Sequence, residues 1–235
     1  MNTANRTSRV LGIAFLLQFI TSFSNGVFLK SALIAPDSIS ESMIKIANNP
    51  ALMRAYILVD MLTALGIIFL GVILFLTLRK QNETMASVAL GCYILEAALL
   101  AASRLDAFSL LGISQAYVAT GQPASLQTMA NISLESMNFV GSTLHMVAFY
   151  PGGILFYYLL YKSGIVPRAL SLWGLITVLP CLIGTLLVVF GYEAPVFLYV
   201  LYMPFELVIG VWILVKGISE VSETKRQPAI ASASA

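Results

Sequence analysis

The feature that most constrains this chain is a series of long apolar segments that are almost free of charged residues. Six of them follow one another: Val10–Leu33, Ala55–Leu78, Met85–Leu111, Asn138–Tyr161, Arg168–Phe190 and Pro195–Lys216. A helix needs about 20 predominantly apolar residues to cross the hydrocarbon core of a bilayer. The segments are continuous runs, without the alternation of a membrane β-strand. We therefore predict an all-α integral membrane bundle of six transmembrane helices.

The composition and charge agree with this fold class. Charged residues make up 10% of the chain and hydrophobic residues 59%, whereas soluble domains carry about 25% charged residues. The six spans leave only short loops, so we expect a single transmembrane domain over residues 1–220 and a disordered cytoplasmic tail over residues 221–235. The net charge of +2 comes without a basic patch, which argues against nucleic acid as a partner. Membrane lipids are the expected partners, and the oligomeric state stays open.

Lysine and arginine residues near the span ends indicate the orientation of the bundle. One side holds nine of them: Arg6, Arg9, Arg79, Lys80, Lys162, Arg168, Lys216, Lys225 and Arg226. The other side holds three: Lys30, Lys45 and Arg54. Because cytoplasmic loops carry an excess of basic residues, we predict that the nine-residue side and both termini are cytoplasmic.

The two longer outer loops carry signals for short helices. Ser38 and Glu41 have the spacing of a capping box, which predicts a short helix through Ala47. The third loop, Gly112 to Met137, is almost uncharged and has Pro123 at a plausible helix start. Either segment could rest on the membrane surface or cover a cavity, but we expect simple surface connectors, because most loops merely connect.

Ionisable residues within the spans are the first candidates for function. They are Asp60, Glu96, Arg104, Asp106, His145 and Glu206. A charged side chain near a helix centre costs about 2.5–3.5 kcal/mol on insertion scales, so such residues need a partner or water. The topology places all of them in the middle and outer half of the bilayer. Four carboxyls face one certain cation, Arg104, so we expect at least one acid, Glu96 or Glu206, to be protonated at neutral pH.

Neutral polar residues repeat this pattern on three helices. Gln18, Ser22 and Asn25 share one face of the first span, and Asn138, Gly141, Ser142 and His145 form a stripe on the fourth. Tyr199, Tyr202 and Glu206 recur on the sixth span beside Pro204, which can kink it. Polar stripes at one depth suggest a cavity open to the outside. Asn25 and Tyr202 therefore join the six ionisable residues as candidate ligand-binding residues.

Three interpretations of these residues stay open. Bundles use polar residues simply to pack and hydrogen-bond helices, so the network can be structural and the protein an accessory or regulatory one. Alternatively, the residues line a cavity that binds or passes a small molecule, a lipid or a proton. An intramembrane enzyme is the third interpretation. The single histidine excludes a histidine-rich zinc site and bis-histidine haem ligation, so we name no catalytic residue, metal ligand or cofactor.

Two motifs resemble a known family. The segment from Arg6 to Gly12, RTSRVLG, resembles the start of the bacterial membrane family labelled domain of unknown function 4386. The stronger motif is LLYKSGIVPRAL, from Leu159 to Leu170, although Ser171 stands where that family usually has glycine. The resemblance implies a multi-pass protein of the bacterial plasma membrane and transfers no catalytic residue. In physical terms, Gly164 ends a helix, and Lys162 and Arg168 lie at headgroup level.

Overall fold

The computed structural model describes residues 3–218 of the chain, so the predicted tail at 221–235 lies outside the described residues. The described part contains helices and turns and no strand. Six helical stretches are long and apolar enough to cross a membrane: 8–33, 50–78, 83–119, 124–163, 168–189 and 197–216. The predicted class, an all-α bundle with six spans, is confirmed.

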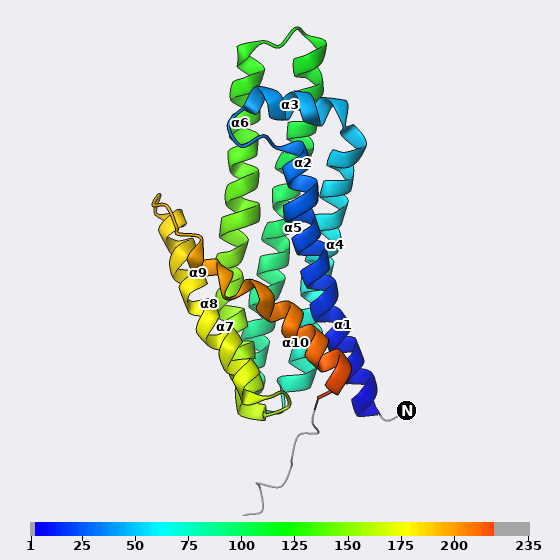
Figure 1. The fold of residues 1–235 in the computed structure, drawn as a ribbon, viewed down its shortest axis with the longest axis vertical. Helices are drawn as coiled ribbons and strands as arrows, with labels where there is room; N and C mark the ends of the chain where they lie inside the picture. The colour runs from blue at the N-terminus through cyan, green and yellow to red at the C-terminus, as the bar shows by residue number, and fades with distance from the viewer. Residues whose placement is uncertain (1–2, 219–235) are drawn as a thin grey trace, which may run out of the picture.

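The first and last spans lie side by side and bring both ends of the described chain to one end of the bundle (Figure 1). They are α1 (Thr3–Ser24) and α10 (Met203–Lys216). A Cβ atom added at Gly12 would lie 2.8 Å from the backbone nitrogen of Leu214, so only glycine permits this approach. Beyond α10, the backbone N–H of Ile218 donates to Ser8 Oγ at 3.0 Å.

Two of the central spans are much longer than predicted. Helix α5 (Glu83–Ala119) has 37 residues, or about 55 Å at 1.5 Å per residue, well beyond the roughly 30 Å of a hydrocarbon core. Helix α6 (Ala124–Asn138) continues through a π-helical segment, η2 (Phe139–Leu144), into α7 (His145–Ser163). The expectation of a simple connector over 112–137 was therefore wrong. That segment is a helical hairpin that turns at Gly121 and Gln122, both with positive φ, and Pro123 precedes α6 as predicted.

A short helix packs against this hairpin and completes a cap at the end of the bundle remote from the termini (Figure 1). Helix α3 (Ile39–Asn48) begins after Ser38, whose Oγ accepts a hydrogen bond from the Glu41 N–H at 3.1 Å, as the capping box predicted. Its buried Met43 and Ile46 share a second apolar core with Tyr117 of α5 and Ala130 of α6. We call α3, residues 107–119 and α6 the cap.

The remaining elements complete the bundle around α5 and α7. Helix α1 continues through the π-helical η1 (Asn25–Lys30) into α2 (Ser31–Leu33), and α4 (Pro50–Leu78) packs on α5. Helix α8 (Arg168–Val189) follows Gly164, which takes the predicted left-handed conformation at φ 65°. The last span was predicted as one kinked helix. It is divided into α9 (Phe197–Val200) and α10, and Pro204 stands in the first turn of α10.

Candidate functional site: a polar cavity between the helices

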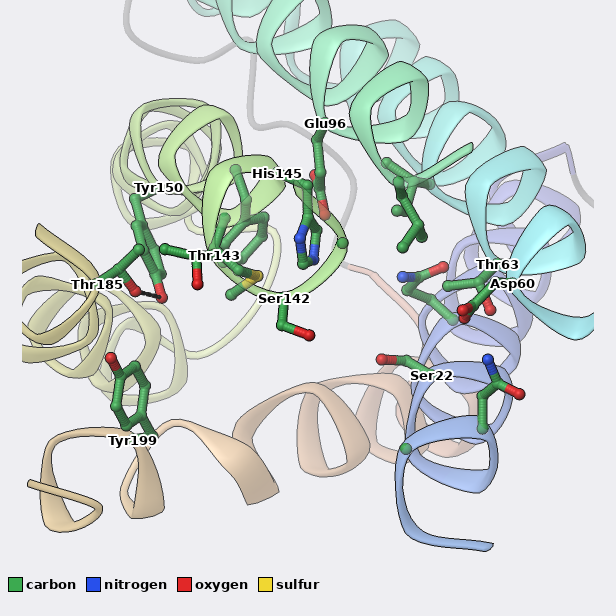
Figure 2. A pocket seen from close by; sticks show the side chains of 18 of the residues that line it. Ser22, Asp60, Thr63, Glu96, Ser142, Thr143, His145, Tyr150, Thr185 and Tyr199 are labelled. Atoms are coloured by element: carbon green, nitrogen blue, oxygen red, sulfur yellow. Dashed lines mark hydrogen bonds between the residues drawn. The ribbon is translucent and has the colours of Figure 1, made fainter. Parts of the chain in front are cut away.

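The main candidate site is a cavity of about 420 Å³ between the helices, with walls from six spans. Figure 2 shows side chains from several of them converging on it. Its polar lining residues are Gln18, Ser22, Asn25, Lys30, Tyr56, Asp60, Thr63, Glu96, Ser142, Thr143, His145, Tyr150, Thr185, Tyr199, Tyr202 and Glu206. Six of the eight predicted site residues are among them: Asn25, Asp60, Glu96, His145, Tyr202 and Glu206.

Two π-helical segments contribute residues to the cavity wall. Segment η1 contributes Asn25, Gly26 and Lys30, and η2 contributes Gly141, Ser142 and Thr143. A π-helical turn widens the backbone spiral and redirects the side chains that follow it, and such turns are frequent at functional sites. The sequence carried no rule that separates these turns from ordinary helix, so only the structure could locate them.

One end of the cavity holds a buried ion pair between neighbouring helices. Arg104 Nη1 of α5 lies 2.5 Å from Asp60 Oδ2 of α4, and their side chains are 4% and 11% exposed. The guanidinium carbon also lies 4.9 Å from the ring centroid of Tyr56, and Nη2 donates to Ser103 Oγ at 2.7 Å. Arg104 itself does not line the cavity. Of the partners left open by the sequence, the acid on the neighbouring helix is the one observed.

The second cation at this end is Lys30, which the sequence analysis treated only as a marker of topology. Its Nζ donates to Asn138 Oδ1 at 2.8 Å, across to the end of α6. Lys30 is the last residue of η1 and Asn138 the last residue of α6, so this bond joins η1 to the end of α6 directly before η2. The signal that was missed is a lone lysine within an otherwise apolar span.

Asp106 lies apart from the cavity, in contrast to its prediction as a candidate. Its Oδ2 accepts a hydrogen bond from Ser136 Oγ of α6 at 2.6 Å. Two residues along a helix turn the side chain by about 200°, since a full turn takes 3.6 residues. Asp106 therefore points away from the face that carries Arg104 and ties α5 to α6.

The other end of the cavity holds two carboxyl groups. Glu96 of α5 is 5% exposed, and its Oε2 has no hydrogen-bond partner. Glu206 Oε1 accepts from Tyr202 Oη at 2.8 Å, and Tyr202 Oη lies 2.6 Å from Tyr157 Oη. Among residues 8–218, whose side chains the structure describes, the only ion pairs are Lys45 with Glu41 and Arg104 with Asp60, so neither glutamate has a cationic partner there.

Aromatic rings and hydroxyls form the wall beside the two glutamates. Phe149, Tyr150, Tyr199 and Tyr202 line this part, and Tyr150 Oη lies 2.9 Å from Thr185 Oγ1 (Figure 2). Sequence reasoning missed Tyr150, Thr185 and also Tyr56 at the opposite end. Tyrosine is common in membrane helices as an interfacial anchor, so its type alone gives no signal of a cavity.

The comparisons with known proteins give a family and no activity. A family model described as a domain of unknown function, DUF4386, matches residues 10–217. The chain belongs to this family. Its description assigns no function, and it confirms the resemblance seen in the two sequence motifs. Comparison with curated proteins and with solved structures finds no match.

For this DUF4386 member, the cavity is distinguished by buried polar atoms that have no hydrogen-bond partner. Gln18 Oε1, Asn25 Oδ1, Glu96 Oε2 and His145 Nδ1 are buried without a hydrogen-bond partner, and all four side chains line the cavity. Buried polar groups are nearly always paired with protein or water. Among residues 3–218 no group of three histidine, cysteine or acidic side chains is arranged to hold a metal ion.

Proposed function

We propose that the chain is a membrane protein that binds a small polar molecule in the cavity between its six spans. The observation that carries this proposal is the position of the unsatisfied polar atoms. Of the six buried side-chain atoms without a hydrogen-bond partner in the described residues, four belong to residues that line the cavity. Leaving a buried polar group unpaired costs about 1–3 kcal/mol. A bound polar molecule, together with water, would satisfy these atoms.

The dimensions of the cavity favour a small molecule over a lipid or a proton alone. Its volume of about 420 Å³ falls in the range of roughly 300–1,000 Å³ typical of small-molecule sites. A proton path needs only a chain of titratable groups and ordered water. A lipid chain favours apolar walls, whereas polar side chains from all six spans reach this cavity.

We further propose the orientation that the basic residues indicate, with both termini in the cytoplasm of a bacterium and the cavity reached from the opposite side of the plasma membrane. The nine basic residues on the side of the termini, against three on the other, support it. The lining residues 25–30 and 56–63 belong to the halves of their spans that are remote from the termini.

The second candidate is a purely structural network in an accessory or regulatory protein. The observation in its favour is the Arg104–Asp60 pair. Arg104 also contacts the ring of Tyr56 and donates to Ser103, so the pair is stabilised without a ligand. Such a pair can hold α4 and α5 in register without further function. It accounts for one end of the cavity and leaves the unpaired acceptors unexplained.

Cysteine labelling tests the proposal. After replacement of Cys92 and Cys181 by alanine, Ser142→Cys places a thiol at an exposed position of η2 that lines the cavity. A small membrane-impermeant thiol reagent applied to intact spheroplasts should label it. The control, Ser171→Cys, lies at a buried position of α8 outside the cavity and should stay unlabelled. If Ser142→Cys resists the reagent from both sides of the membrane, the cavity is sealed and the structural network is correct.

A further inference from the structure

We propose that the molecule taken up by this cavity is an organic cation, a protonated amine or guanidine. Its N–H groups would lie at Glu96 and Glu206, and its apolar part would lie against the aromatic wall. This inference rests on the proposed function and adds the substrate class. Three independent observations carry it: the type of the unsatisfied atoms, the distribution of charge and the composition of the wall.

Three of the four unsatisfied atoms of the cavity are oxygens that accept hydrogen bonds. The amide oxygens of Gln18 and Asn25 accept hydrogen bonds from a ligand, and Glu96 Oε2 does so when Glu96 is ionised. Among the described residues, the only unsatisfied buried atom of the cavity lining that can donate is the imidazole nitrogen of His145. A complementary ligand must therefore supply several N–H or O–H groups. A primary ammonium supplies three donors and a guanidinium five.

The charge of the cavity is divided between its two ends. The cations Arg104 and Lys30 are engaged by Asp60 and Asn138 respectively. Glu96 and Glu206 line the same cavity, and neither has a cationic partner among the described residues. Two neighbouring carboxyls in a poorly solvated site attract a positive charge. An anionic ligand would meet their repulsion instead.

The wall beside the glutamates distinguishes an organic cation from a small inorganic one. Phe149, Tyr150, Tyr199 and Tyr202 line the cavity, Tyr202 donates to Glu206, and the ring of Phe149 lies 5.8 Å from that of Tyr202. Aromatic faces attract ammonium and guanidinium groups, and they also pack against apolar carbon. A hard divalent ion needs several oxygen ligands around it, and no group of three suitable side chains was found in residues 3–218.

The test compares three probes that share a phenyl ring and differ in charge: phenethylamine, phenethyl alcohol and hydrocinnamate. Binding to the full-length chain in detergent micelles is measured by titration calorimetry at neutral pH. We expect the amine to bind. Removing one member of a buried charge pair costs 2–5 kcal/mol or more, so the alcohol and the carboxylate should bind at least about 30-fold more weakly.

Two isosteric variants and a matched control complete the experiment. Glu96→Gln and Glu206→Gln remove the charge without changing the shape, and each should weaken binding of the amine by a similar factor. Glu135→Gln makes the same change at an exposed position of the cap and should have no effect. The amine should also protect Ser142→Cys from the thiol reagent.

The outcomes separate this inference from the proposed function. If the alcohol binds as well as the amine and protects Ser142→Cys equally, the cavity binds small molecules but does not select cations. If the amine does not bind, or if Glu135→Gln weakens binding of the amine as much as Glu96→Gln and Glu206→Gln do, the cation inference is wrong. The proposed function is then decided by the labelling of Ser142→Cys alone.

Discussion

The strongest prediction concerns the ion pair between Arg104 and Asp60, because its burial allows a magnitude to be assigned. With side chains only 4% and 11% exposed, water screens either charge little when its partner is removed. Breaking a buried pair in this way costs about 3–5 kcal/mol. Loss of the cation–π contact with Tyr56 adds about 0.5–2 kcal/mol when the arginine is the residue replaced.

A double-mutant cycle isolates the pair from these other effects. Arg104→Met and Asp60→Asn should each destabilise the protein strongly, because each leaves a lone charge. The double variant removes both charges and should be more stable than the sum of the single losses predicts, by about 2–3 kcal/mol. The free energy of unfolding is measured by titrating the protein in mixed micelles with dodecyl sulfate and following its circular dichroism.

The control is an exposed ion pair of the same kind of residues. Lys45 Nζ lies 2.8 Å from Glu41 Oε1 on α3, with side chains 38% and 58% exposed. Lys45→Ala should cost no more than about 0.5 kcal/mol, as for other exposed helix pairs. If Arg104→Met costs as little as Lys45→Ala, or if the losses in the double variant are simply additive, the buried pair does not stabilise the bundle and the reasoning fails.

Three other predictions follow from single positions. Gly141→Ala would bring a Cβ into contact with the guanidinium of Arg104, so it should destabilise the protein by about 1–3 kcal/mol in the same unfolding assay. The control Gly91→Ala has open space around it and should be neutral or stabilising. Cysteines at position 125 of the cap and position 81 of the opposite turn should show opposite labelling by an impermeant reagent in intact spheroplasts, and the reverse pattern would overturn the orientation. Ser38→Ala removes the N-cap of α3 and should lower local stability by about 1 kcal/mol, seen as faster amide hydrogen exchange in 39–48 only.

The six spans and the depth of their polar residues in the bilayer could be predicted, because both are properties of single segments. The apolar composition of a segment such as Ala55–Leu78 is enough to identify it as a span. The depth of a residue such as Glu96 follows from its position along one helix. The same counting placed six of the eight candidate residues on the cavity. It failed for Asp106, because its angle around α5 directs it toward Ser136 and the structure was needed to show which face meets the cavity.

The hairpin of the cap, unlike α3, differs from the sequence expectation for a related reason. Residues 112–137 are less apolar than the spans, so the sequence predicts a connector, yet they continue α5 and form α6. Their helices are stabilised by the apolar core that Tyr117 and Ala130 share with Met43 of α3. That core joins segments far apart in the chain, and no local pattern in any one of them reveals it.

From the sequence alone it follows that this chain has six segments long and apolar enough to cross a membrane, that most of them begin within a few residues of the observed helices, and which ionisable groups lie within them. These follow from the cost of placing charge and unpaired backbone in hydrocarbon, which each segment meets alone. Packing between distant segments was needed to show that Arg104 pairs with Asp60, that Lys30 of η1 bonds to Asn138 at the end of α6, and that Glu96 and Glu206 line one cavity without an ion-pair partner among the described residues. Those facts depend on the angle of each helix about its axis and on its neighbours, which packing between distant segments selects.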